Sequence, residues 1–180
     1  MFKEENDKNE LILSGKIVNI FPAKNCVIVT LRIGNQTFPK VVCWQNNAEL
    51  ILEKYKVNSD ICLLCNIQSS CFQGKITTSI FCTEILNEPI TESDTCNDFI
   101  VKGRIHSVYE SKHLIKVIVE TTTNGRYSTI PICIYNNMPR WHYEKHQPFC
   151  ARGNVETRRK SSNGRTNYFT NFVASYISDY

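Results

Sequence analysis

The sequence predicts an all-β protein made of two tandem five-stranded barrels, with one short helix in each. Three observations lead to this fold class. The chain of 180 residues contains an internal repeat at an offset of 88 residues. Its apolar residues alternate with the two-residue period of strands. A helix-like segment follows the third predicted strand of each copy. Together these features indicate two copies of one small β domain.

The repeat is clearest where residues 11–21 align with residues 99–109. Apolar, glycine, basic and aromatic positions coincide, and Gly15 lies over Gly103. Other segments align at or near the same offset: 27–31 with 115–119, 38–44 with 129–135, and 61–67 with 149–155. The alignment predicts four consecutive regions, namely a flexible N-terminus at 1–8, a first barrel at 9–88, a polar linker at 89–96 and a second barrel at 97–179.

The elements follow in the same order in both copies. The predicted strands are 11–21, 26–33, 37–44, 60–69 and 75–85 in the first copy, and 99–109, 114–123, 127–135, 148–158 and 165–177 in the second. The first helix is expected at 48–55 after Asn47, and the second near Asn137 and Pro139, because Asn caps helices and Pro suits their first turn. Asn163-Gly164 predicts a tight hairpin turn. Five strands with a helix after the third follow the plan of an OB-fold.

Composition narrows the function classes. No apolar run approaches the length of a membrane span, and the first ten residues lack the apolar stretch of a signal peptide, so a cytoplasmic protein is expected. Nine cysteines, an odd number, suit free thiols in a reducing compartment. A metal site at Cys62 and Cys65 lacks a second pair of ligands at suitable spacing. We therefore expect no metal and no cofactor.

Basic residues gather in the second half of the chain. Residues 1–90 hold nine Lys or Arg and nine Asp or Glu, whereas residues 91–180 hold twelve and eight. This asymmetry indicates an anionic partner, with nucleic acid the leading candidate. The predicted final hairpin carries four cations that could follow a phosphate backbone: Arg158, Arg159, Lys160 and Arg165. The alternative interpretation is a solvated hairpin tip.

Aromatic residues supply the second feature of a nucleic-acid interface. Phe38, Lys40 and Trp44 share one face of a predicted strand, and a cation between two aromatics fits a binding face better than a core. A core position remains the alternative for Phe38 and Trp44. Tyr135 ends the equivalent strand of the second copy, and Phe72 lies on a hairpin. The other aromatics of these regions are expected in or over the core: Phe81, Phe169, Phe172, Trp141 and Tyr143.

The segment Phe-Pro-Lys-Val-Val-Cys-Trp at 38–44 resembles the third strand of bacterial and phage single-stranded DNA-binding proteins, whose domain is an OB-fold. The resemblance implies that Phe38 and Trp44 stack on bases. In the second copy Thr129 replaces one of these aromatics, so only Tyr135 carries over. Residues 153–158 are similar to the family's fourth strand. Lys160 then stands where the family has another stacking aromatic, and Phe72 occupies that place in the first copy.

The resemblance implies non-enzymatic binding and protection of single-stranded DNA in replication, recombination or mobile-element maintenance. A homodimer would supply the four OB domains of the family's common form. Because the sequence ends soon after its last predicted strand, we do not expect the acidic tail with which the family recruits replication and recombination proteins. No catalytic motif is present, so an enzyme is not expected. An OB-fold protein-interaction adaptor and a single-stranded RNA-binding module remain alternatives.

Overall fold

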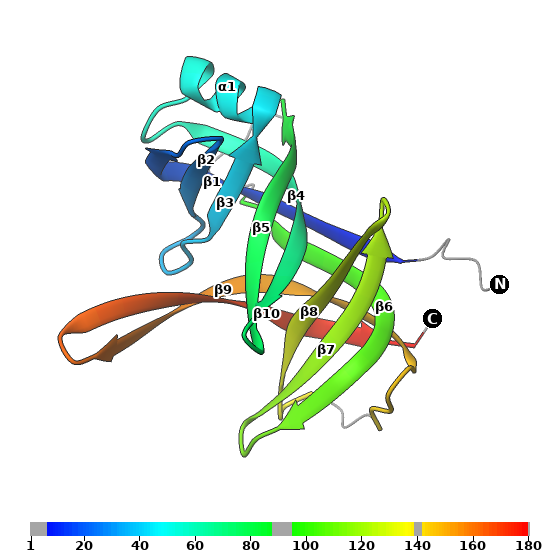
Figure 1. Ribbon diagram of the computed structural model, residues 1–180. Helices are drawn as coiled ribbons and strands as arrows, with labels where there is room; N and C mark the ends of the chain where they lie inside the picture. Colours follow the sequence, from blue (N-terminus) through cyan, green and yellow to red (C-terminus); the bar gives the residue numbers. More distant parts are fainter. Residues whose placement is uncertain (1–6, 88–94, 139–141, 180) are drawn as a thin grey trace.

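The computed structural model describes residues 7–87, 95–138 and 142–179, with the backbone alone at 71–72 and 165–167 (Figure 1). The first half of the chain holds five strands and a helix: β1 (Lys8–Pro22), β2 (Cys26–Arg32), β3 (Lys40–Trp44), α1 (Gln45–Lys54), β4 (Asp60–Phe72) and β5 (Lys75–Leu86). The second half holds five strands: β6 (Asn97–Glu110), β7 (Leu114–Thr123), β8 (Arg126–Tyr135), β9 (Pro148–Ser162) and β10 (Arg165–Ser178). The predicted all-β class is confirmed.

The strands of each half close into a ring with the same order of neighbours. In the first half β1 pairs with both β2 and β4, and the ring runs β1-β2-β3-β5-β4. In the second half β6 pairs with both β7 and β9, and the ring runs β6-β7-β8-β10-β9. Each ring contains one parallel pair, β3 with β5 and β8 with β10. We call these rings barrel one and barrel two.

Glycines at equivalent positions let the first strand of each barrel bend closely over the second. A Cβ added to Gly15 would lie 2.4 Å from the carbonyl oxygen of Arg32, and one added to Gly103 would lie 2.0 Å from that of Glu120. Each pair of strands then shifts register just beyond the glycine. The 88-residue repeat therefore reflects a shared need for close backbone approach.

An asparagine at the equivalent position of each barrel joins strands by the same pair of hydrogen bonds. The Asn9 amide donates to the Ile67 carbonyl oxygen at 2.6 Å and accepts from the Ile67 N–H at 2.8 Å. The Asn97 amide makes both bonds to Val155, each at 2.8 Å. Both asparagines and both partners are related by the 88-residue offset, so the side-chain contacts repeat as well as the backbone.

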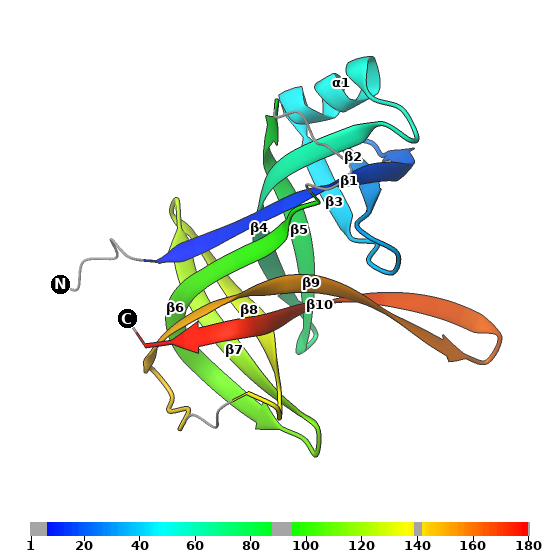
Figure 2. The same cartoon turned by 180° about the vertical axis from the view of Figure 1, so that it is seen from behind.

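The two barrels are joined along their first strands. The N-terminal part of β1 pairs antiparallel with β6, from Lys8 opposite Lys102 to Leu13 opposite Asn97. Leu11 and Phe99 face each other in this pairing, and both are fully buried within one hydrophobic cluster that includes residues of both barrels. Figure 2 shows β1 and β6 side by side at the junction. Lys8, expected in a flexible terminus, is thus the first residue of a paired strand.

The helices differ from the sequence-based expectation. Helix α1 begins at Gln45, whose φ of 49° makes the turn from β3, and Trp44 is its N-cap. Asn47 therefore does not cap the helix; its amide donates to the Thr83 carbonyl oxygen at 3.3 Å. The expected second helix is absent from the described residues, since 136–138 form a turn and a bend and 139–141 lie outside them. Local capping signals did not anticipate the backbone path from β3 into α1.

Two long hairpins extend from the barrels. Strands β4 and β9 reach Phe72 and Ser162, a few residues beyond their predicted ends. Asn163 and Gly164 have φ values of 51° and 72°, as in the tight turn that this dipeptide predicts. The β9–β10 hairpin leaves barrel two and runs beneath barrel one, while the tip of the β4–β5 hairpin points toward barrel two (Figure 1).

Two global features of the described residues complete the fold. The one described helix is too short to span a bilayer. The eight described cysteines are free thiols, and six of them are buried. Burial raises the pKa of the Cys65 thiol well above its usual value. Such thiols pack as small apolar side chains.

Candidate nucleic-acid interface

Strand β3 presents the predicted binding face of barrel one. Val41 and Cys43 are fully buried, whereas the side chains between and beside them alternate to the outside. Lys40 is exposed, and Trp44 remains 44% exposed at the end of the strand. Because residues two apart in a strand share a face, Lys40 and Trp44 lie on the same surface, as the sequence predicts. The core alternative for Trp44 is wrong.

Phe38 joins this surface to the second barrel. It precedes β3 and is half-buried. Its backbone N–H donates to the Thr157 hydroxyl oxygen on β9 at 2.9 Å. The long hairpin of barrel two therefore contacts the predicted site of barrel one, an arrangement that no local sequence signal indicates.

Tyr135 and Arg158, both predicted site residues, come together on barrel two. The Arg158 guanidinium lies 5.2 Å from the centre of the Tyr135 ring. The Tyr135 hydroxyl donates to the Glu156 carboxylate at 3.3 Å, and that carboxylate lies 3.9 Å from the Arg158 guanidinium. One face of the half-buried ring is thus occupied by a cation. A base approaching that face must displace Arg158.

The cations of the β9–β10 hairpin lie on two faces. Arg158, opposite Phe169, shares a face with Lys160, whereas Arg159 points the other way with its partner Tyr168. All three basic side chains are exposed. The predicted side chains of Phe72 and Arg165 lie outside the described part of the structure. The hairpin therefore offers positive charge on both of its faces.

A groove of about 580 Å³ runs between the two barrels. Phe38 and Lys40 contribute from barrel one, and Tyr168 and Phe169 contribute from the long hairpin of barrel two. Tyr168 is 61% exposed and Phe169 is 50% exposed. Aromatic and basic residues of both barrels therefore line one depression, and the alternation along β10 directs the rings of Tyr168 and Phe169 to opposite faces.

The prediction for the last strand was right at one aromatic and wrong at another. Phe172 is buried and packs edge-on against Phe99, with ring centres 6.0 Å apart. Phe169, also expected in the core, is half-exposed in the groove, and Phe81 is half-buried. Phe169 and Phe172 are three residues apart and therefore point to opposite faces of the strand, so both could not have entered the core. That spacing is the signal that sequence reasoning missed.

Three charged groups act on the buried Cys133 thiol of β8: Lys116, Arg158 and Glu156. Burial raises the pKa of the Cys133 thiol, and the Lys116 and Arg158 cations oppose this rise by stabilising the thiolate. The Glu156 carboxylate acts in the same direction as burial. Two cations and one anion therefore act on this thiol, and burial outweighs the effect of the cations.

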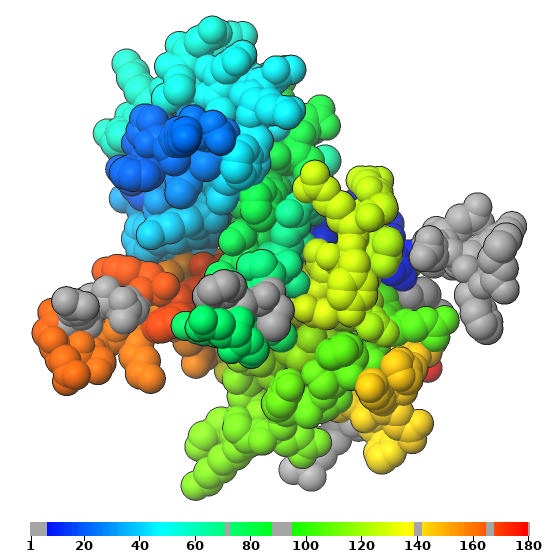
Figure 3. All heavy atoms as spheres, in the orientation of Figure 1, coloured from blue at the N-terminus to red at the C-terminus, as the bar shows by residue number. Residues whose placement is uncertain are grey.

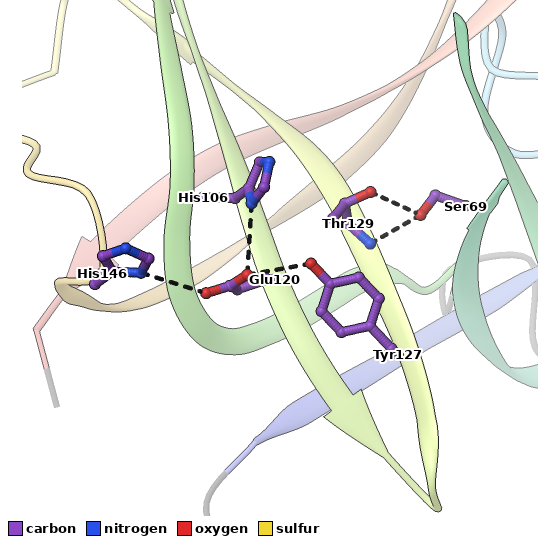
Figure 4. A network of polar contacts seen from close by, with 6 residues as sticks. All are labelled: Ser69, His106, Glu120, Tyr127, Thr129 and His146. Atoms are coloured by element: carbon purple, nitrogen blue, oxygen red, sulfur yellow. Dashed lines mark hydrogen bonds and ion pairs between the residues drawn. The ribbon is translucent and has the colours of Figure 1, made fainter. Parts of the chain in front are cut away.

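A polar cluster surrounds Glu120 on β7 (Figure 4). His106 and His146 each place Nδ1 near the Glu120 carboxylate, at 3.5 and 3.7 Å, and the Tyr127 hydroxyl donates to it at 3.1 Å. Burial and this carboxylate raise the pKa of Tyr127. Among the residues with described positions, no group of three His, Cys, Asp or Glu side chains is arranged to hold a metal ion.

Tyr143, expected to cover the core, does so. It is half-buried against the hydrophobic cluster, and its ring centre lies 6.2 Å from that of Phe149 at an angle of 65°. Burial raises the pKa of its hydroxyl. Trp141, its companion in that prediction, lies outside the described residues.

The sequence matches no protein-family model, and no curated protein matches it at a significant level. The structure, however, is similar to two crystal structures of the single-stranded DNA binding protein from Thermus aquaticus. A deletion mutant of that protein has a TM-score of 0.71 and 11% identity, over 97% of this chain and 95% of that one. The wild-type protein has a TM-score of 0.69 and 11% identity, over 97% and 93%. The two proteins share an OB-fold barrel architecture.

Proposed function

We propose that this protein binds single-stranded DNA without catalysis, through two OB-fold barrels that act on one strand. The observation that carries the proposal is the groove between the barrels, which Phe38 and Lys40 line from one side and Tyr168 and Phe169 from the other barrel. The fold shared with the Thermus single-stranded DNA binding protein supports it. Replication, recombination or mobile-element maintenance would use such an activity.

The chemistry of the groove suits a single strand better than a duplex. Exposed rings can stack on any base, because every base has a π-face, at about 1–3 kcal/mol per base. Bases inside a duplex are already stacked on each other and cannot reach these rings. Lysine and arginine side chains neutralise the phosphates, independently of sequence.

We assign stacking to Phe38, Trp44 and Tyr135, with Tyr168 and Phe169 added from the structure. Lys40 and the hairpin cations Arg158, Arg159 and Lys160 would contact phosphates. Phe72 and Arg165 remain in the proposal on sequence grounds: a stacking aromatic on one hairpin tip and a cation on the other.

The test is a tryptophan-fluorescence titration with an oligothymidine and with a matched duplex, each at two salt concentrations. We expect quenching and salt-sensitive binding with the single strand, and weak binding to the duplex. In Trp44→Phe the remaining tryptophan is Trp141, so most of the quenching should disappear while binding, followed by anisotropy, persists.

Two outcomes would redirect the proposal. Absence of binding to any oligonucleotide at low salt would overturn it and favour a protein-interaction adaptor. Equal or tighter binding of an oligouridine would change the ligand from DNA to RNA.

A homodimer with four barrels is a separate proposal, and a sedimentation mass close to one chain of 20.8 kDa at micromolar concentration would contradict it.

A further inference from the structure

A second hollow, of about 550 Å³, lies between the tip of the β4–β5 hairpin and barrel two. Lys75 and Ile76 line it from barrel one. Tyr109, Leu114 and Lys116 line it from β6 and β7 of barrel two. None of these residues belongs to the binding face that the sequence predicts, so this hollow is a feature of the assembled barrels.

The lining combines an apolar floor with an exposed ring and two cations. Ile118 and Leu114 form part of the floor, and Tyr109 is 61% exposed at the rim. Neither Lys75 nor Lys116 forms an ion pair within the described part of the chain. Glu110 is the one described carboxylate in the lining. An apolar surface beside a ring and unpaired cations matches a nucleobase and its phosphates.

The hollow adjoins the groove described above. Lys75, Ile76, Lys116 and Pro131 line both depressions, so the two share a wall at the hairpin tip. In the space-filling view the tip lies between the β9–β10 hairpin and the strands of barrel two (Figure 3). The Ser69 hydroxyl holds this hairpin against barrel two by accepting from the Thr129 N–H at 2.8 Å (Figure 4).

We infer that the hollow under the β4–β5 tip is a second subsite for the same nucleic-acid strand, reached only when the strand is long enough to leave the first groove and cross to barrel two. The inference rests on the proposed function. A short strand fills the groove beside Phe38, and a longer one continues past the hairpin tip to stack on Tyr109.

The charge of the hollow and the wall that it shares with the groove indicate which ligand would occupy it. Two lysines face the space against one glutamate, so the hollow favours an anion. The shared wall means that a strand lying in the groove already has its next nucleotides directed toward the hollow. The subsite therefore adds affinity to a bound strand without a second ligand, and its effect depends on strand length.

The test compares oligothymidines of about 8 and about 30 nucleotides, the shorter one chosen within the range that a single OB barrel covers. Binding of the short oligomer is followed by Trp44 fluorescence, and binding of the long one by anisotropy. Two variants alter only the second hollow: Tyr109→Ala removes the ring, and Ser111→Glu adds negative charge beside it. We expect both to weaken long-oligomer binding by about tenfold and to leave short-oligomer binding unchanged.

Matched controls lie outside both depressions. Tyr176→Ala removes a ring that is 58% exposed at the other end of β10, and Ser175→Glu adds a charge beside it. Neither control should change binding at either length. Unchanged long-oligomer binding in both hollow variants, or equal losses at both lengths, would overturn the second subsite while leaving the first groove intact. If the unmodified protein binds neither oligomer, the proposed function itself has failed.

Discussion

Barrels one and two keep the same internal contacts but differ in their surfaces. Gly15 and Gly103 allow the same close strand approach, and Asn9 and Asn97 make the same hydrogen bonds. On the surface, the apolar Ile28 of barrel one corresponds to Lys116 of barrel two at the 88-residue offset. The comparison shows that closing the barrel restricts the interior of both copies, whereas the outer face was free to change.

The long hairpins of the two barrels are equivalent in sequence order, and each contacts the other barrel. The tip of β4–β5 lies against barrel two, and Ser69 bonds to Thr129 there. The β9–β10 hairpin instead extends under barrel one, where Thr157 accepts from the Phe38 N–H. Equivalent elements thus reach toward the opposite barrel from both sides. Each barrel contributes to the surface of the other, and the candidate interface belongs to the pair.

The largest effect should come from closing the space at the equivalent glycines. Gly103→Ala and Gly15→Ala each force a Cβ against a backbone carbonyl oxygen, so each should lower the free energy of unfolding by about 3 kcal/mol. The added Cβ would lie closer to the carbonyl oxygen at Gly103, so Gly103→Ala should lower the free energy of unfolding more than Gly15→Ala. Denaturant unfolding followed by circular dichroism measures both.

These variants also test whether the barrels unfold together. The β1–β6 pairing and the shared core predict one cooperative transition, which either substitution shifts as a whole. Two separate transitions, with only one moved by each glycine, would show instead that the barrels are independent domains.

Substituting the equivalent asparagines should lower the free energy of unfolding in proportion to how deeply each side chain is buried. Asn9→Ala leaves both backbone groups of Ile67 without partners at a position only 7% exposed, so we expect a loss of about 2 kcal/mol in stability. Asn97 is half-buried, and water can replace part of its bonding to Val155, so Asn97→Ala should cost about 1 kcal/mol. Thermal and denaturant unfolding give the two values, and equal losses would contradict this ranking.

Substituting the aromatic residue at the end of the third strand should weaken binding more in barrel one. Trp44 is exposed, so Trp44→Ala should reduce affinity for an oligothymidine by about 2 kcal/mol. The ring of Tyr135 already carries Arg158 on one face, and Tyr135→Ala should cost about 1 kcal/mol or less. Fluorescence anisotropy at fixed salt compares them. A larger loss at Tyr135 would reverse the proposed roles of the two barrels.

The smallest change is expected in the salt dependence. Replacing both Arg158 and Arg159 by Gln should flatten the slope of log affinity against log salt by about 0.7 per lost phosphate contact. Lys40→Gln removes one phosphate contact instead of two, so it should flatten the slope about half as much as the double replacement does. Trp44→Ala, which removes no charge, is the control and should leave the slope unaltered. If it flattens the slope as much as the arginine variants do, stacking and charge are not separable at this site.

Much of the fold could be predicted because its signals are local. Alternating apolar residues locate a strand whatever surrounds it, and the ten predicted strands differ from the observed ones by a few residues at their ends. Asn163-Gly164 determines a turn through two positive φ values that these residues tolerate. The start of α1 was missed because Gln45, which carries no capping signal, makes the turn out of β3.

The candidate site was predicted in parts. Lys40 and Trp44 share an exposed face because alternation along a strand assigns sides, and alternation is visible in the sequence. Phe169 was misplaced because the hairpin continues beyond the barrel, where neither face of the strand meets a core. Tyr109, Lys75 and Lys116 carried no local signal at all. They gain their significance only from the opposite barrel.

The sequence by itself determined the strand pattern, the repeat with its equivalent glycines, and the tight turn of the long hairpin. All of these depend on neighbours along a strand or on a repeat within the chain. The tertiary structure decided where the two hairpins rest, and therefore which rings and cations line one groove. That arrangement depends on contacts such as Phe38 with Thr157 and Ser69 with Thr129. These pairs lie 119 and 60 residues apart, and no local periodicity encodes such distances.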